Sequence, residues 1–260
     1  MIDTHTHLYM TDSFPDGGKA AVGRALEAGV EMMVLPAVDR ESVDPMFALH
    51  QNFPENTALA LGLHPTEVEE DWRDELKEIL DRSAEADLVA IGETGMDLYW
   101  DASNPKRQMD AFGEQIQIAL DRELPVIVHS RNALKETIEV INNFSGKKPV
   151  FVFHSFTAGR KEAEQLMEAA PESFFGINGV ITFKNAVPLR EAVLHLDADK
   201  IVTETDSPFL APVPHRGKTN ESSYIPHIIR AIADIRNENE DVIARLTHRN
   251  ALRLFPKLQT

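Results

Sequence analysis

The first ten residues, MIDTHTHLYM (residues 1–10), guide the interpretation of the whole chain. Residues 2–7 predict a short strand, and His5 and His7 lie two positions apart within it. Side chains two positions apart on an extended strand point to the same face, so both imidazoles should reach one point at its C-terminal end. Imidazole is a common ligand for divalent transition metals. The alternative is a surface strand with two incidental histidines, so a metal site requires further ligands from elsewhere in the chain.

Apolar segments of strand length recur along the chain at fairly even intervals. They cover residues 2–5, 31–36, 58–63, 88–92, 126–129, 150–154, 174–177 and 200–203. Amphipathic helices are predicted between them, for example where Met109, Phe112, Ile116 and Leu120 share one helix face. Other segments with helical periodicity are 25–30, 45–52, 72–80, 134–141, 163–170 and a closing helix at 240–255.

This alternation of apolar strands and amphipathic helices is typical of a parallel sheet covered by helices. Eight such units in 260 residues predict an α/β fold, a (β/α)₈ TIM barrel, with residues 1–260 forming a single domain. A doubly wound open sheet is the alternative, but no glycine-rich dinucleotide loop follows the first strand.

Composition excludes several classes of protein. The chain has no cysteine, which excludes disulfides and thiolate catalysis and restricts metal ligands to nitrogen and oxygen. The net charge of −16 disfavours unspecific coating of nucleic acid, and argues against a DNA-binding module more than against a nuclease. No secretory signal and no apolar stretch of membrane-spanning length is visible, so we expect a soluble, cytoplasmic protein without membrane association.

Ionisable residues gather at the C-terminal ends of the predicted strands, the rim where TIM barrels carry their active sites. Five of the ten histidines fall there, together with one glutamate and one aspartate. The residues at these strand ends are His5, His7, His64, Glu93, His129, His154 and Asp206.

Six of these residues are predicted metal ligands: His5, His7, Glu93, His129, His154 and Asp206. Six ligands are too many for one tetrahedral zinc ion but suit two divalent ions, which can clamp the attacking and leaving oxygens of a displacement. We expect one ion on His5, His7 and Asp206, the other on His129 and His154, and Glu93 shared. The predicted catalytic residues are Asp206 as proton acceptor, Glu93 and His64. Alternatively, Asp206 is a hydrogen-bond partner of a ligating histidine.

Cations near the barrel mouth are predicted to bind an anionic substrate, although solvated surface charge is the alternative. The predicted substrate-binding residues are Arg131, Lys184, Arg216 and Lys218, three of which follow the seventh and eighth strands, where barrels often bind phosphate. Glu204 and Glu221 either orient lysine or arginine side chains or remain solvated. Tyr99 and Trp100 either stack on a base or pack above the barrel.

Together these motifs resemble the TatD family of metal-dependent deoxyribonucleases. The resemblance rests on residues 2–7 (IDTHTH), 62–65 (GLHP), 92–97 (GETGMD), 125–131, 153–156 (FHSF), 182–186 (TFKNA), 204–210 and 216–221 (RGKTNE), which appear in the family's order across nearly the whole chain. It implies a TIM barrel of the amidohydrolase-like group that hydrolyses phosphodiester bonds in DNA, typically as an exonuclease. The family's metal positions match the six predicted ligands, and His64 matches an active-site histidine. Trp100 stands where a basic residue is frequent.

The resemblance also implies a cofactor and a partner. We expect two divalent ions, and the imidazole-rich ligand set suits zinc or manganese, whereas the family is usually described as magnesium-dependent. DNA, preferably single-stranded or with frayed ends, is the expected substrate, and no stable protein partner is expected.

Two other functions are compatible with this sequence. A binuclear amidohydrolase or esterase would act on a small amide, a lactone or an aminoacyl-nucleotide. Many such enzymes bridge their ions with a carbamylated lysine on the fourth strand, whereas this chain has Glu93 there. A non-enzymatic metal scaffold would lack part of the ligand series, and no ligand is missing.

Overall fold

The computed structural model describes residues 1–259, and in this part of the chain eight parallel strands form one sheet in the order β1 to β8. The strands are β1 (Ile2–Asp3), β2 (Met32–Pro36), β3 (Thr57–Leu61), β4 (Leu88–Asp97), β5 (Val126–Arg131), β6 (Phe151–Phe153), β7 (Phe174–Ile177) and β8 (Ile201–Thr203). The first and last strands also meet, since the Thr4 amide donates to the Thr203 carbonyl at 3.0 Å and Thr6 pairs with Ser207. The predicted TIM barrel is therefore confirmed, and the open-sheet alternative is wrong.

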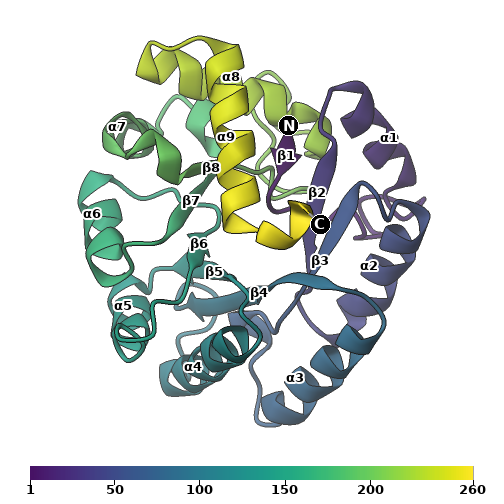
Figure 1. The fold of residues 1–260 in the computed structure, drawn as a ribbon, viewed down its shortest axis with the longest axis vertical. Helices are drawn as coiled ribbons and strands as arrows, with labels where there is room; N and C mark the ends of the chain where they lie inside the picture. Colours follow the sequence, from purple (N-terminus) through teal and green to yellow (C-terminus); the bar gives the residue numbers. More distant parts are fainter. Residues whose placement is uncertain (260) are drawn as a thin grey trace.

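Helices follow the strands and surround the barrel (Figure 1). They are α1 (Lys19–Glu27), α2 (Arg40–Asn52), α3 (Trp72–Asp81), α4 (Pro105–Asp121), α5 (Leu134–Asn142), α6 (Arg160–Ala169), α7 (Val187–His195), α8 (Ile225–Arg236) and α9 (Glu240–Leu254). The last of them, α9, crosses one end of the barrel rather than joining the outer ring (Figure 1). No helix within residues 1–259 is both long and apolar enough to span a bilayer.

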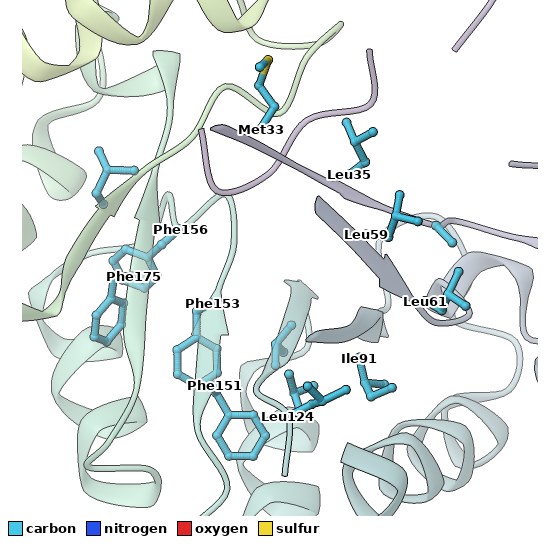
Figure 2. Packing of buried hydrophobic residues seen from close by; sticks show 14 of the residues in the cluster. Met33, Leu35, Leu59, Leu61, Ile91, Leu124, Phe151, Phe153, Phe156 and Phe175 are labelled. Carbon is cyan, nitrogen blue, oxygen red and sulfur yellow. The ribbon is translucent and has the colours of Figure 1, made fainter. Parts of the chain in front are cut away.

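Apolar packing occurs in two layers, one on each side of the sheet. Inside the barrel, small and branched side chains such as Val34, Ala60 and Val202 form one cluster, which Leu254 and Phe255 close at the α9 end. The outer layer lies between the sheet and the helices (Figure 2). Because both faces of the strands are covered, the strands are almost continuously apolar, as their sequences predicted.

Several predicted segments differ in extent from the structure, and three of the differences are instructive. The strand predicted over residues 2–7 ends at Asp3, whose carboxylate accepts from the His5 amide at 3.3 Å and from the Thr205 amide at 2.9 Å. The fourth strand continues beyond Gly92 to Asp97, with a shift of register against β5. The helix predicted over residues 25–30 is α1, which begins earlier and ends at Glu27.

A substitution at Phe175 tests how much the outer apolar layer contributes to stability. It is fully buried, and its ring centroid lies 5.7 Å from that of Phe153 and 5.0 Å from that of Phe156. We expect Phe175→Ala to lower the free energy of unfolding by about 3–5 kcal/mol, because it removes buried apolar area and leaves a cavity. The matched control is Phe209→Ala, which removes a half-exposed ring. It should change the free energy of unfolding by less than about 0.5 kcal/mol. Denaturant titration measures both, and equal effects would contradict this account of the packing.

Candidate metal centre

The polar end of the barrel holds all six predicted ligands in one cluster. The rim forms a pocket of about 730 Å³, and five of the six, His7, Glu93, His129, His154 and Asp206, line it. The sixth, His5, is fully buried beside them. The ligands come from segments far apart in sequence, and the parallel strands bring them together because all the carboxyl ends meet at this end of the barrel.

One group of ligands faces the Oε2 atom of Glu93. His5 Nε2 lies 3.3 Å from this oxygen and His7 Nε2 lies 3.7 Å from it. Asp206 Oδ1 completes the group, 3.7 Å from His5 Nε2 and 3.8 Å from His7 Nε2. The nitrogen and oxygen atoms of His5, His7 and Asp206 are close enough to share one metal ion. This is the first set of ligands that the sequence predicted.

A second group faces the other oxygen of the same carboxylate. Glu93 Oε1 lies 2.6 Å from His154 Nε2, 3.1 Å from His129 Nδ1 and 3.5 Å from His64 Nε2. The sequence predicted His129 and His154 here, and placed His64 outside the ligands as a catalytic residue. In the structure His64 joins Glu93 and His129 in a group with metal-binding spacing. Glu93 therefore lies between the two groups, with one oxygen toward each.

Hydrogen bonds to the far sides of two rings fix which nitrogen faces the centre. The Tyr9 hydroxyl donates to the Pro36 carbonyl at 2.5 Å and so accepts from His7 Nδ1 at 2.9 Å. Asp97 Oδ2 lies 2.9 Å from His129 Nε2. When these rings are neutral, as metal binding requires, the far nitrogens carry the protons, and His7 Nε2 and His129 Nδ1 are left to face the cluster.

Glu204 contributes a further carboxylate that the sequence did not assign to the site. It is fully buried rather than orienting a cation, and its Oε1 accepts from the Ser155 amide and lies 3.8 Å from His154 Nδ1. The space exists because residue 176 is glycine, since any side chain there would collide with this carboxylate. The sequence feature that could have assigned Glu204 to the site is its position directly after β8. Glu221, by contrast, does orient an arginine, accepting from Arg24 Nε at 2.9 Å.

Burial and charge pairing set the protonation of the cluster. Burial alone would raise the pKa of Glu93, but the surrounding imidazoles hold it well below its usual value. Burial would lower the pKa of His154, but the adjacent Glu93 carboxylate raises it to about 10. Burial dominates at His5 and His7, whose pKa values fall. It also raises the pKa of Asp206 to about 6.

This donor set fits divalent ions. Neutral imidazoles and ionised carboxylates are their ordinary ligands, and the cluster concentrates both in a buried site. His5 and His154 also direct Nε2 at the centre, although neither buried Nδ1 atom has a hydrogen-bond partner within residues 1–259. A bound cation would replace the proton that His154 otherwise holds against Glu93, because coordination requires neutral imidazole.

The four predicted substrate-binding cations are distributed unevenly. Arg131 lines the pocket. Lys184, Arg216 and Lys218 are exposed on the loops after β7 and β8, outside the residues that line it. The Arg216 guanidinium lies 4.2 Å above the Phe183 ring. Contact between these three cations and a substrate stays a prediction.

Comparison with known protein families shows to which family this chain belongs. Residues 2–256 match the family described as "TatD related DNase". The chain belongs to the TatD family. A relative named "Uncharacterized metal-dependent hydrolase YabD" from Bacillus subtilis (strain 168) is 32% identical, over 98% of both chains. The "3'-5' ssDNA/RNA exonuclease TatD" of Pectobacterium carotovorum subsp. carotovorum (strain PC1) is 33% identical, over 94% of this chain and 95% of that one.

Solved structures agree with this assignment. A TatD homologue from Escherichia coli K12, YJJV, superimposes with a TM-score of 0.89 at 28% identity, covering 98% of each chain. An uncharacterized amidohydrolase from Saccharomyces cerevisiae superimposes with a TM-score of 0.82 at 15% identity, covering 98% of this chain and 99% of that one, which shows a shared fold alone. This TatD-family protein is a metal-dependent hydrolase, and its residues 1–259 contain three overlapping groups of candidate ligands.

Metal binding to the TatD-family centre should release protons. At pH 7.5 His154 is protonated against Glu93, because its pKa lies near 10, and a divalent ion must displace that proton. We expect calorimetric titration of metal-free protein with Zn²⁺, in buffers of different ionisation enthalpy, to show at least one proton released per chain. The release should decline as the pH rises toward about 10, where the imidazole loses its proton unaided.

The variant His154→Ala should release fewer protons, whereas His195→Ala, on the outer helix α7, should behave as the native chain. Binding without proton release at pH 7.5 would show that His154 is neutral before the ion arrives.

Proposed function

We propose that this protein is a two-metal phosphodiesterase that removes nucleotides from the ends of DNA, with single-stranded or frayed ends preferred. The observation that carries the proposal is the Glu93 carboxylate, whose two oxygens face separate sets of nitrogen and oxygen ligands in an open pocket. The relative named as a single-stranded DNA and RNA exonuclease supports nucleic acid as the substrate class. Arg131 at the pocket supports an anionic substrate.

In this proposal two divalent ions bind per chain. One is held by His5, His7 and Asp206, the other by His129 and His154, and Glu93 touches both. His64, 3.5 Å from Glu93 Oε1, is near enough to contact the second ion or the substrate. When bound, zinc, manganese or magnesium would supply Lewis acidity toward the phosphate and lower the pKa of the attacking water.

Asp206 is the proposed proton acceptor for the attacking water. It lies just beyond β8 with its carboxylate toward the histidine pair, and Oδ1 is 3.7 Å from His5 Nε2. Burial raises its pKa to about 6, which brings it nearer to neutral pH, where general bases are most effective. Its backbone has a φ of 57°, a left-handed conformation that aspartate and asparagine tolerate better than most residues.

Asp206→Asn tests this role. Asparagine keeps the shape, the backbone conformation and an oxygen ligand, but cannot accept the proton. We expect kcat to fall by about 10²–10⁴-fold at verified metal content, with the fold retained. Asp197→Asn, an exposed position, is the matched control and should leave kcat unchanged. A kcat within a few-fold of the native value would give the role to another group, His64 before Glu204, because the latter is fully buried behind His154.

A polyanionic substrate should make the activity depend on salt. The chain carries a net charge of −16, so attraction to DNA rests on a few local cations that salt screens. We expect activity to decrease with ionic strength, and the double variant Lys184→Ala/Arg216→Ala to raise KM more than it lowers kcat. The control Arg73→Ala/Lys77→Ala removes the same charge from the outer helix α3. Equal KM values for the two double variants would exclude Lys184 and Arg216 from substrate binding.

A separate assay compares the candidate classes of substrate. Purified protein would be assayed with Mg²⁺, Mn²⁺ and Co²⁺ against single-stranded DNA, single-stranded RNA, a panel of cyclic amides and lactones, and an aminoacyl-tRNA. We expect turnover of the nucleic acids. Hydrolysis of an amide or ester, without any cleavage of DNA or RNA, would replace the nuclease proposal with the amidohydrolase or esterase alternative.

A further inference from the structure

At the pocket mouth, two exposed aromatic rings that the proposed hydrolysis does not use lie beside the guanidinium of Arg131. Trp100 is 69% exposed and Tyr99 is 53% exposed. The Arg131 guanidinium lies 3.9 Å from the Tyr99 ring centroid and 5.4 Å from that of Trp100. We infer that Trp100, Tyr99 and Arg131, here called the stacking platform, bind an unpaired nucleobase of the substrate; this inference rests on the proposed nuclease function.

The platform is tied directly to the metal centre. The Tyr99 and Trp100 amides both donate to Asp97 Oδ1 at 2.8 Å, while the other oxygen of this carboxylate lies 2.9 Å from His129 Nε2. Arg131 is the residue opposite Asp97 in the register of β4 and β5. One carboxylate therefore holds both the turn that carries the rings and a candidate metal ligand. A base on the platform would have a fixed position relative to the reacting phosphate.

The platform also belongs to the same pocket as the ligands. Trp100 and Arg131 line it, and so do Phe209 and Leu210 from the loop after β8. These two side chains are 52% and 40% exposed, and β8 lies across the barrel from β4 in the strand order. The mouth thus carries exposed apolar side chains on two sides, with the ion-binding groups below them. Exposed apolar surface at a pocket is typical of ligand binding.

The charge of Arg131 favours nucleic acid over an uncharged apolar ligand. No carboxylate lies within ion-pair distance of its guanidinium in the part of the chain that the structure describes, whereas many other arginines of this acidic protein are paired, as Arg24 is with Glu221. A guanidinium stacked on an aromatic ring can still bind phosphate through its edge. The platform therefore combines a face for a base with a positive charge for its phosphate.

Stacking explains a preference for single strands. A base inside a duplex has both faces covered by its neighbours, so only an unpaired or frayed base can lie on Trp100. Such stacking tolerates any sequence, because every base has a π-face. A purely structural role for Trp100 in packing above the barrel is a weaker explanation of its position, because a ring that is 69% exposed buries little of its own area.

The test compares Trp100→Ala with the native enzyme on two oligonucleotides. One is ordinary single-stranded DNA, and the other carries abasic tetrahydrofuran residues at the end that is cleaved. We expect the variant to raise KM for ordinary DNA by roughly 5- to 150-fold, the range for loss of one base–aromatic stack, with kcat within a few-fold. KM for the abasic substrate should not change. Trp100→Phe should restore most of the loss, and Leu194→Ala, a similarly exposed position on α7, should behave as native.

Direct binding separates this inference from the proposed function. In Asp206→Asn protein, thymidine oligonucleotides should quench the fluorescence of Trp100, and ribonucleotide oligomers of the same length should do so as well. Quenching without cleavage by the native enzyme would overturn the nuclease function but not the base-binding site. Cleavage of both substrates, with equal effects of Trp100→Ala on each or none on either, would overturn the stacking platform while leaving the nuclease function intact.

Discussion

The carboxylate of Glu93 is the group on which the centre depends. A buried negative charge is costly unless it is paired, and here three imidazole nitrogens lie within 3.5 Å of Oε1 alone. His5 and His7 approach the other oxygen. Without ions, protonated His154 balances this charge, and bound divalent ions would balance it in its place.

The barrel can hold so polar a cluster because its two ends are built differently. Small apolar side chains fill the interior, and residues at the end of α9 cover one mouth (Figure 1). The opposite mouth contributes the charged groups, while the outer helices bury a separate apolar layer (Figure 2). Stability rests mainly on the two apolar layers, so the rim residues are free to be selected for chemistry.

The fold, and the clustering of the candidate ligands, could be predicted from the sequence because both depend on simple periodicities. Strands covered on both faces are continuously apolar, and ionisable residues directly after them must lie at one rim. The supporting groups could not be predicted in this way. Asp97 bonds to His129 only because β4 continues past Glu93 in register with β5, and Glu204 faces His154 only because residue 176 has no side chain. The Tyr9 hydroxyl reaches the Pro36 carbonyl because β1 and β2 are neighbours in the sheet, a pairing that no local pattern encodes.

Asp97 shows how positioning and recognition are coupled in this fold. Its two oxygens serve different parts of the site, one holding the turn of the stacking platform and the other fixing His129. Because the net charge is strongly negative, long-range attraction of a polyanion is weak, and binding must come from short-range contacts. In the proposed function, ions at the centre and rings at the mouth that stack on a base would provide contacts of that kind. Neither would distinguish one base from another, so the proposed function is degradation of unpaired strands rather than recognition of a sequence.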